Sequence, residues 1–165
     1  MTLERLWAGW RSAYIETVTS EPTDDACLFC RLAAEDPEEA LVLARDDFVF
    51  TVMNAYPYTS GHMMIAPLRH EATLTGLSAN EAAAVMHMTQ AAVTAMQTAY
   101  RPDGYNVGVN VGKAAGAGIP SHVHVHALPR WAGDTNFVTS VAEARVLPEA
   151  LRDSYDKLRK AWPGR

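Results

Sequence analysis

The stretch Ser121-His122-Val123-His124-Val125-His126-Ala127-Leu128-Pro129-Arg130 decides how this chain is organised, because it holds three of the six histidines at alternate positions. Successive side chains of a β-strand point to opposite faces. In a strand, His122, His124 and His126 therefore share one face, and the valines between them point to the other. The pattern predicts a strand with one chemical face and one core face.

Three neighbouring imidazoles are not ordinary packing residues. A buried histidine needs hydrogen-bond partners, and each neighbour makes protonation of the next more costly. Two functional interpretations remain open: a metal site, or a histidine nucleophile flanked by helpers. A solvated strand face that merely carries histidines is the third interpretation, and nothing in strand propensity favours it.

Composition limits the class of protein. The 165 residues are 48% hydrophobic, so we expect a single domain over residues 1–165, with residues 1–26 as an N-terminal arm. The formal net charge is −5 and no basic cluster occurs, which disfavours a nucleic-acid partner. Charges interrupt the apolar N-terminal stretch, and no later stretch has the length of a membrane span. We therefore expect a cytoplasmic protein without a membrane partner.

The apolar patterns indicate an α+β fold. Strands are expected at 41–44, 48–53, 63–67 and 105–111, and the turn at 45–47 makes the first two a hairpin. Ser78-Ala79-Asn80-Glu81 has the form of a capping box, which predicts one long helix ending before Pro102. A final helix is expected over residues 148–162. We expect an antiparallel meander of about five strands, with the long helix packed on one face.

Cys27-Leu28-Phe29-Cys30 contains the only two cysteines of the sequence. In a chain expected to stay in the cytoplasm, such a pair is more often a metal clip or a redox pair than a structural disulfide. His70 and His122 are the candidates that would complete a tetrahedral Cys2His2 zinc site. The alternative is two reduced, partly buried thiols.

Two loops are candidates for ligand binding. The loop from Asn54 to His62 breaks the strand pattern with proline and glycine, and binding residues often lie in such loops. A second loop, residues 112–120, contains Gly112, Gly116 and Gly118, with Lys113 nearby. Glycines let backbone amides approach phosphate oxygens closely. A phosphate held by the second loop would be delivered to the histidines that follow it.

These motifs resemble the histidine triad superfamily of nucleotide hydrolases and transferases. Together with the triad, residues 4–7, 27–30, 54–62, 101–104 and 129–137 look like the bacterial branch that contains diadenosine tetraphosphate phosphorylases. The resemblance implies that His124 attacks the α-phosphorus of a nucleotide and becomes transiently nucleotidylated. It further implies that Asn54 binds the ribose, that His62 lines the base pocket, and that the protein is a homodimer. Several branches carry a similar set of Cys27, Cys30, His70 and His122 equivalents.

The chain departs from the family at Ile119. Hydrolase branches usually place Gln and then Ser or Thr before the triad, whereas this chain has Gly118 and Ile119. Ile119 has no side-chain donor, so phosphate contacts are expected from the backbone amides of residues 116–118, from Ser121 or from Asn110. Lys113, Asn110 and Ser121 are the candidates to orient an incoming phosphate.

The sequence thus predicts a nucleotidyl-histidine mechanism. His124 would attack through Nε2 while its Nδ1–H bonds a strand carbonyl. His126 would donate hydrogen bonds to phosphoryl oxygens, and His122 would orient its neighbours. The expected reaction converts diadenosine tetraphosphate and inorganic phosphate into ATP and ADP. Hydrolysis of dinucleoside polyphosphates or phosphoramidates is the alternative reaction, and a non-catalytic zinc-bearing nucleotide-binding module is the competing class.

Overall fold

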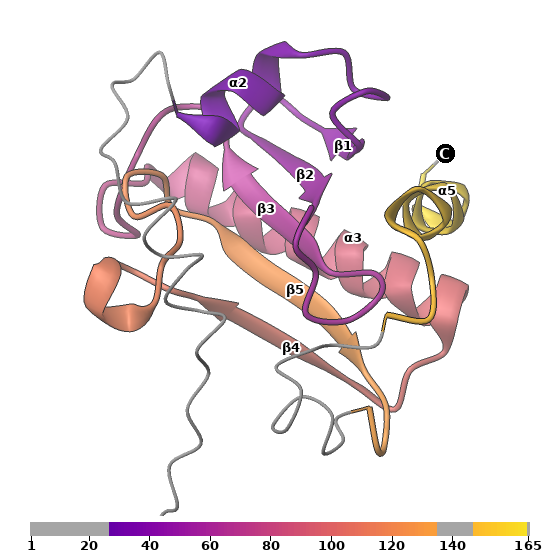
Figure 1. The fold of residues 1–165 in the computed structure, drawn as a ribbon. Coiled ribbons are helices and arrows are strands. Elements are labelled where there is room, and N and C mark those ends of the chain that lie inside the picture. Colours follow the sequence, from indigo (N-terminus) through magenta and orange to yellow (C-terminus); the bar gives the residue numbers. More distant parts are fainter. Residues whose placement is uncertain (1–26, 135–146, 165) are drawn as a thin grey trace, which may run out of the picture.

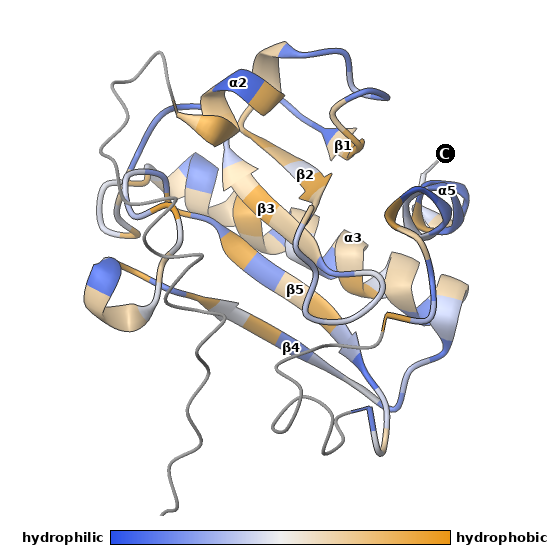
Figure 2. Cartoon of the chain, in the orientation of Figure 1, coloured by the Kyte–Doolittle hydropathy of each residue, from blue (hydrophilic) through white to orange (hydrophobic). Residues whose placement is uncertain are grey.

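Two strands form the centre of the sheet: β2 (Val49–Met53) and β3 (Met63–Pro67), in which every residue is buried. Runs that are apolar on both sides suit strands covered on both faces. The computed structural model describes residues 27–134 and 147–164. Figure 2 shows β2 and β3 drawn largely in the hydrophobic colours.

The two faces of the sheet are covered by different helices. Helices α3 (Ala79–Tyr100) and α5 (Leu151–Ala161) pack on one face, in a core that includes Met63, Ile65 and Tyr155. Helix α2 (Leu28–Ala34) lies on the other face, where Phe29 packs with residues such as Met64. Figure 1 shows α3 running behind the sheet and α2 at the end of β1 and β2. The sheet therefore separates a large core from a smaller one.

The sheet is antiparallel throughout, and its strand order is β1-β2-β3-β5-β4. The remaining strands are β1 (Val42–Arg45), β4 (Gly104–Val109) and β5 (Val125–Arg130), with a short 3-10 helix η2 (Lys113–Ala115) before β5. The predicted α+β fold with five antiparallel strands is confirmed. The order is not that of a plain meander, because β5 lies between β3 and β4 and leaves β4 at the edge of the sheet (Figure 1).

The fourth strand differs from its prediction. An alternating strand was expected at 105–111, but β4 spans Gly104–Val109 and three consecutive residues, Asn106 to Gly108, are exposed. The strand lies at the edge of the sheet, and only its inner side pairs with β5. An edge strand with an open face carries no requirement for alternating burial.

The histidine stretch also differs in part. All three histidines were expected in one strand, but β5 begins at Val125, so only His126 of the three is a strand residue. His126 pairs with Met64 of the α2-side core, whereas Val125 pairs with Ile65 of the α3-side core. One side of the stretch is thus chemical and the other is core, as expected.

The long helix lies where it was predicted, whereas the final helix was predicted from Pro148 and begins at Leu151. The capping box is present: Ser78 Oγ accepts the Glu81 N–H and Glu81 Oε2 accepts the Ser78 N–H. The final helix buries Tyr155 and Leu158 as its spacing predicts. Sequence analysis did not anticipate α2, and the predicted arm at residues 1–26 lies outside the described residues.

Among the described helices, none has the length and the apolar character needed to cross a bilayer. The single-domain organisation, the cytoplasmic location and the homodimer stay predictions.

Candidate functional site

The α2 side of the sheet gathers the predicted cysteine and histidine residues from three separate segments. The two cysteines lie at the start of α2, His70 follows β3, and His122 and His124 precede β5. The ring of Phe29 lies 5.2 Å from that of His122 and 4.7 Å from that of His124, measured between centroids. Phe29 therefore holds these two histidines on the same side as His126.

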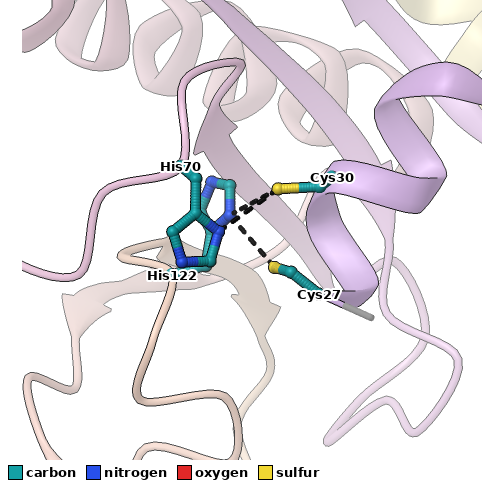
Figure 3. Close-up of side chains that lie close together, drawn as sticks. All are labelled: Cys27, Cys30, His70 and His122. Atoms are coloured by element: carbon teal, nitrogen blue, oxygen red, sulfur yellow. Dashed lines mark hydrogen bonds between the residues drawn. The ribbon is translucent and has the colours of Figure 1, made fainter. Parts of the chain in front are cut away.

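Cys27, Cys30, His70 and His122 form one cluster (Figure 3). One ligand atom from each residue lies within 4.8 Å of the others. The Sγ atoms of Cys27 and Cys30 are 3.3 and 3.7 Å from His122 Nδ1, and Cys30 Sγ is 3.3 Å from His70 Nδ1. Two sulfurs and two imidazole nitrogens so arranged can bind one metal ion, and the structure thus brings together the four predicted residues.

The backbone selects the tautomer of His122 that a metal ligand needs. Its Nε2 lies 2.9 Å from the carbonyl oxygen of Pro67, and a carbonyl only accepts hydrogen bonds, so Nε2 carries the proton. The lone pair is then on Nδ1, which faces the sulfurs. Burial lowers the pKa of His122 to about 4, which keeps the ring neutral at pH 7. This arrangement matches the common case in which a ligating histidine donates its other N–H to a carbonyl.

His124 is oriented by the same kind of contact. Its Nδ1 lies 2.8 Å from the carbonyl oxygen of His122, so Nδ1 donates and Nε2 keeps its lone pair. The side chain is buried, and burial lowers the pKa of His124. A neutral imidazole with an unprotonated Nε2 has the electronic form of a nucleophile.

The orientation of His62 follows from the loop that precedes it. Asn54 Oδ1 accepts the Tyr56 N–H at 2.9 Å, which fixes the amide so that Nδ2 faces His62 Nδ1 at 3.2 Å. The Tyr58 N–H also donates to His62 Nδ1, at 3.1 Å. Because both neighbours donate, Nδ1 of His62 is the acceptor and its Nε2 carries the proton.

His62 in turn sets the tautomer of His126. The Nε2 of His62 lies 3.0 Å from His126 Nδ1, so His62 donates and His126 Nδ1 accepts. The proton of a neutral His126 is therefore on Nε2, the form that can donate to an oxyanion. The rings of His124 and His126 are 4.8 Å apart, centroid to centroid. The site thus presents one imidazole lone pair beside one imidazole N–H.

A cavity of about 810 Å³ opens beside these two histidines. Asn54, Tyr58, His124 and His126 contribute to its wall, as do Gly116 and Gly118. Most of the remaining wall is apolar and includes Leu28, Leu32, Val52, Met64, Ile119 and Leu151. An apolar cavity with a few polar groups at one end is typical of a small-molecule site.

The other predicted binding residues are more widely distributed. His62 is fully buried and is not part of the cavity wall, so it reaches the cavity through His126. Asn110 lines a second cavity of about 990 Å³, which meets the first at Tyr58 and His126. Lys113 is exposed on η2. The Oγ of Ser121 is buried and makes no hydrogen bond to the described residues.

The glycine loop is a tight turn rather than an open set of donors. Gly112 and Gly116 have φ values of 78° and 83°, a left-handed backbone that favours glycine. The amides of Gly116 and Ala117 donate to the carbonyls of Lys113 and Gly112. Of the amides predicted to bind phosphate, these two already have partners within the turn.

Several residues of the site were not identified from the sequence. Phe29 lies on α2, whose seven residues give too short a pattern to be recognised. Tyr58 lies in the predicted binding loop, and its ring stacks on those of His62 and His126, so its position in that loop was the available signal. Arg69 had no signal, because its contacts depend on how the loop through Gly76 closes onto the start of α3.

Comparisons with known proteins agree with this arrangement. Residues 35–133 match the family model described as the HIT domain. A relative named AP-4-A phosphorylase, from Mycobacterium tuberculosis, is 39% identical over 165 residues, which cover 97% of this chain and 85% of that protein. Among solved structures, a Zn-bound histidine triad family protein from Mycobacterium smegmatis has a TM-score of 0.68 and 27% identity, covering 84% of this chain and 94% of that one. A HIT-like protein from Bartonella henselae has a TM-score of 0.69 and 24% identity, covering 86% and 99%.

The hydrogen-bond network predicts the tautomers of three histidines. At pH 8, where the imidazoles are neutral, His124 should carry its proton on Nδ1, and His62 and His126 should carry theirs on Nε2. Long-range proton–nitrogen correlation spectra distinguish these forms. Exposed His87 of α3 is the matched control and should show the exchanging mixture of a solvated ring. A proton on Nε2 of His124 would contradict the network.

Proposed function

Because the chain belongs to the histidine triad (HIT) family, we propose that it is a nucleotidyl-transferring enzyme that cleaves diadenosine tetraphosphate. The observation that carries the proposal is the pairing of an Nε2 lone pair on His124 with an Nε2–H on His126, at the end of a cavity large enough for a nucleoside. The relative named AP-4-A phosphorylase supports the choice of a dinucleoside polyphosphate.

His124 begins the reaction by attacking the α-phosphorus through Nε2. A nitrogen–phosphorus bond forms, the bond from the α-phosphorus to the bridging oxygen breaks, and ATP leaves. Splitting one displacement into two in this way lowers the difficulty of each. The backbone carbonyl of His122 accepts the Nδ1–H of His124 and keeps this imidazole in the attacking orientation.

His126 supplies the hydrogen bond that the transition state needs. Negative charge builds on the non-bridging oxygens as the bond to the leaving group breaks, and a preorganised donor stabilises that charge. Tyr58 and Asn54 donate to His62, and His62 donates to His126 Nδ1. This chain of hydrogen bonds fixes the proton of His126 on Nε2. In this account His62 is a positioning residue beneath the site, and Asn54 helps to position it.

The apolar cavity is the place for the nucleoside. Its wall of leucine, valine and methionine side chains can bury a base, and Asn54 lies within the same wall for contact with the ribose. The second cavity also borders His126 and contains Asn110, whereas its two cations are already paired, Arg130 with Asp134 and Lys157 with Glu149. The neutral amide of Asn110 is a donor suited to the remaining phosphates or to an incoming phosphate.

The acceptor in the second step is proposed to be inorganic phosphate. An oxygen of phosphate attacks the adenylylated His124, the nitrogen–phosphorus bond breaks, and ADP is released. Ile119 in place of a hydroxyl side chain, together with the relative named AP-4-A phosphorylase, favours phosphate over water. The runner-up is a HIT-type hydrolase, in which water takes the same step and AMP is the product.

The four-residue cluster is proposed to bind a structural zinc ion. Zinc held tetrahedrally by two thiolates and two imidazoles separates its ligand atoms by roughly 3.5 Å. The distances of 3.3, 3.7 and 3.3 Å between sulfur and nitrogen atoms are close to that value. A zinc ion with four protein ligands would add its binding free energy to folding. Cys27, Cys30, His70 and His122 would then hold α2 against the histidine segment.

His124→Ala should abolish turnover while the fold remains intact. Removing the nucleophile should lower kcat by at least about a thousandfold, equivalent to about 4 kcal/mol of barrier. The measurement is release of ATP from diadenosine tetraphosphate, with circular dichroism to check folding. His87→Ala, an exposed histidine on α3, should match the parent. A folded His124→Ala variant with parental turnover would refute the mechanism.

Phosphate should change both the rate and the products. Adding inorganic phosphate should accelerate breakdown of diadenosine tetraphosphate and change the products from AMP plus ATP to ADP plus ATP. Chromatography of the nucleotides at several phosphate concentrations measures this directly, with sulfate at equal ionic strength as the control. An unchanged rate with AMP as product would make the protein a hydrolase and leave the role of His124 untouched.

Metal removal tests the zinc proposal. Elemental analysis of protein purified without chelators should give one zinc per chain, and a strong chelator should lower the melting temperature. Cys27→Ser should lose the metal and melt at a lower temperature, whereas His87→Ala should retain both properties. The absence of zinc from the parent protein, or a Cys27→Ser variant with full metal content, would count against the site.

A further inference from the structure

The segment from Pro67 to Glu71 contacts the histidine segment through two backbone carbonyls. Pro67 O accepts the Nε2–H of His122 at 2.9 Å, and Glu71 O accepts the N–H of Val123 at 2.6 Å. Between them, His70 places its Nδ1 3.3 Å from Cys30 Sγ. The position of this short segment therefore determines where both histidines of the cluster lie.

The segment lacks the support of regular structure beyond β3. Strand β3 ends at Pro67, and residues 68–71 belong to neither a helix nor a strand. Leu68 bonds the Phe48 carbonyl through its N–H, at the start of the segment. The rest of the segment depends on side chains for its position.

Arg69 provides that support by reaching the first turn of α3. Its Nε and Nη2 donate to the two carboxylate oxygens of Glu81 at 2.8 and 2.9 Å, a bidentate pair. Nη2 also donates to the carbonyl of Gly76 at 2.8 Å, and Nη1 donates to Glu71 Oε2 at 3.2 Å. Glu81 is itself fixed by the capping box, because its Oε2 accepts the Ser78 N–H. The start of the long helix thus holds the segment.

The loop between Glu71 and Gly76 closes tightly around these contacts. Glu71 Oε1 accepts the backbone N–H and the hydroxyl of Thr73 at 2.9 and 3.0 Å. A Cβ atom at Gly76 would lie 2.2 Å from the Glu71 carboxylate carbon, so a larger residue there would displace this carboxylate. Glycine at position 76 therefore lets Glu71 keep its contacts to Arg69 and Thr73.

Arg69 contributes more to orientation than to folding free energy. Its side chain is 50% exposed, and ion pairs at such positions contribute about 1 kcal/mol or less. A bidentate guanidinium–carboxylate pair nevertheless fixes direction, since both partners are planar and the two hydrogen bonds are parallel. A residue of this kind can be replaced with little loss of stability and still alter what it orients.

We propose that Arg69 is a positioning residue of the site: by joining the segment Pro67–Glu71 to Glu81, it holds His70 and His122 for the metal and His124 for the reaction. The connection to His124 is direct, because the carbonyl that accepts its Nδ1–H belongs to His122. A displacement of His122 therefore rotates the lone pair of His124 away from its attack direction. The inference rests on the proposed function for its metal and kinetic readouts.

The test compares Arg69→Ala with two matched controls. Arg152→Ala removes another arginine that is half exposed, at 49%, and paired with two carboxylates, Glu38 and Asp156. Ser78→Ala weakens the start of α3 and leaves every Arg69 contact to residues 71 and 76 in place. Losing this serine cap costs about 1 kcal/mol of stability. Arg152→Ala therefore controls for the loss of a positive charge, and Ser78→Ala controls for the loss of stability.

Three quantities are measured on each variant: the zinc dissociation constant by chelator competition, kcat and KM for diadenosine tetraphosphate, and amide hydrogen exchange of Val123. Arg69→Ala should weaken zinc binding and lower kcat by at least about tenfold each, the usual scale for residues that support metal ligands. KM should stay within about twofold. Exchange of the Val123 amide should accelerate by at least about tenfold, because its bond to Glu71 O loosens. Arg69→Lys keeps the charge without the bidentate geometry and should lie between Arg69→Ala and the parent.

Each outcome decides the proposal. If Arg69→Ala matches Ser78→Ala in all three quantities, Arg69 is only structural and the inference fails. If Arg152→Ala has the same effects, they come from lost charge and the inference fails as well. Should the parent protein bind no zinc and show no turnover, the proposed function is wrong. The exchange of Val123 then still decides: accelerated exchange in Arg69→Ala alone supports the positioning role, and unchanged exchange overturns it.

Discussion

The site depends on the hydrogen bond between the Nε2–H of His122 and the carbonyl oxygen of Pro67. This bond fixes the ring of His122 with its lone pair toward the sulfurs of Cys27 and Cys30. The same residue offers its own carbonyl to His124 Nδ1. One backbone-anchored histidine therefore sets both the donor geometry of the cluster and the tautomer of the residue beside the cavity. Displacing it would disturb the cluster through its side chain and His124 through its backbone carbonyl.

Burial keeps both imidazoles of this arrangement in the neutral form. Desolvation disfavours the imidazolium form and lowers the pKa of both His122 and His124. A metal ligand and a nucleophile both need the neutral ring, so the same low-dielectric environment serves both. The ring of Phe29 is part of that environment, because it lies against both imidazoles. Residues 27–30, at the start of α2, thus supply two thiols and the apolar cover within about one helical turn.

The sequence predicted those features that depend on interactions between residues close together in the chain. The capping box at Ser78, the strand at Met63–Pro67 and the carbonyl partner of His124 all depend on neighbouring residues, and each has the expected form. The insertion of β5 between β3 and β4 depends on pairing between distant segments, which no periodicity encodes. The contacts around Arg69 are closer along the chain, but they depend on how the loop through Gly76 closes, which no periodicity encodes either. His62 was recognised as a site residue from the sequence. Its hydrogen bond to His126 could not be predicted, because it depends on the geometry of the loop.

Strand order explains why two cavities lined by distant segments both border His126. Because β5 lies between β3 and β4, His126 pairs across one side with Met64 and across the other with Gly108. The first pairing places His126 beside the apolar cavity, and the second places it beside the cavity that contains Asn110. An apolar wall discriminates weakly between ligands of similar size, whereas a buried donor rejects a group that cannot accept its hydrogen bond. Selectivity at this site must therefore come from the polar groups around His126, where the two cavities meet.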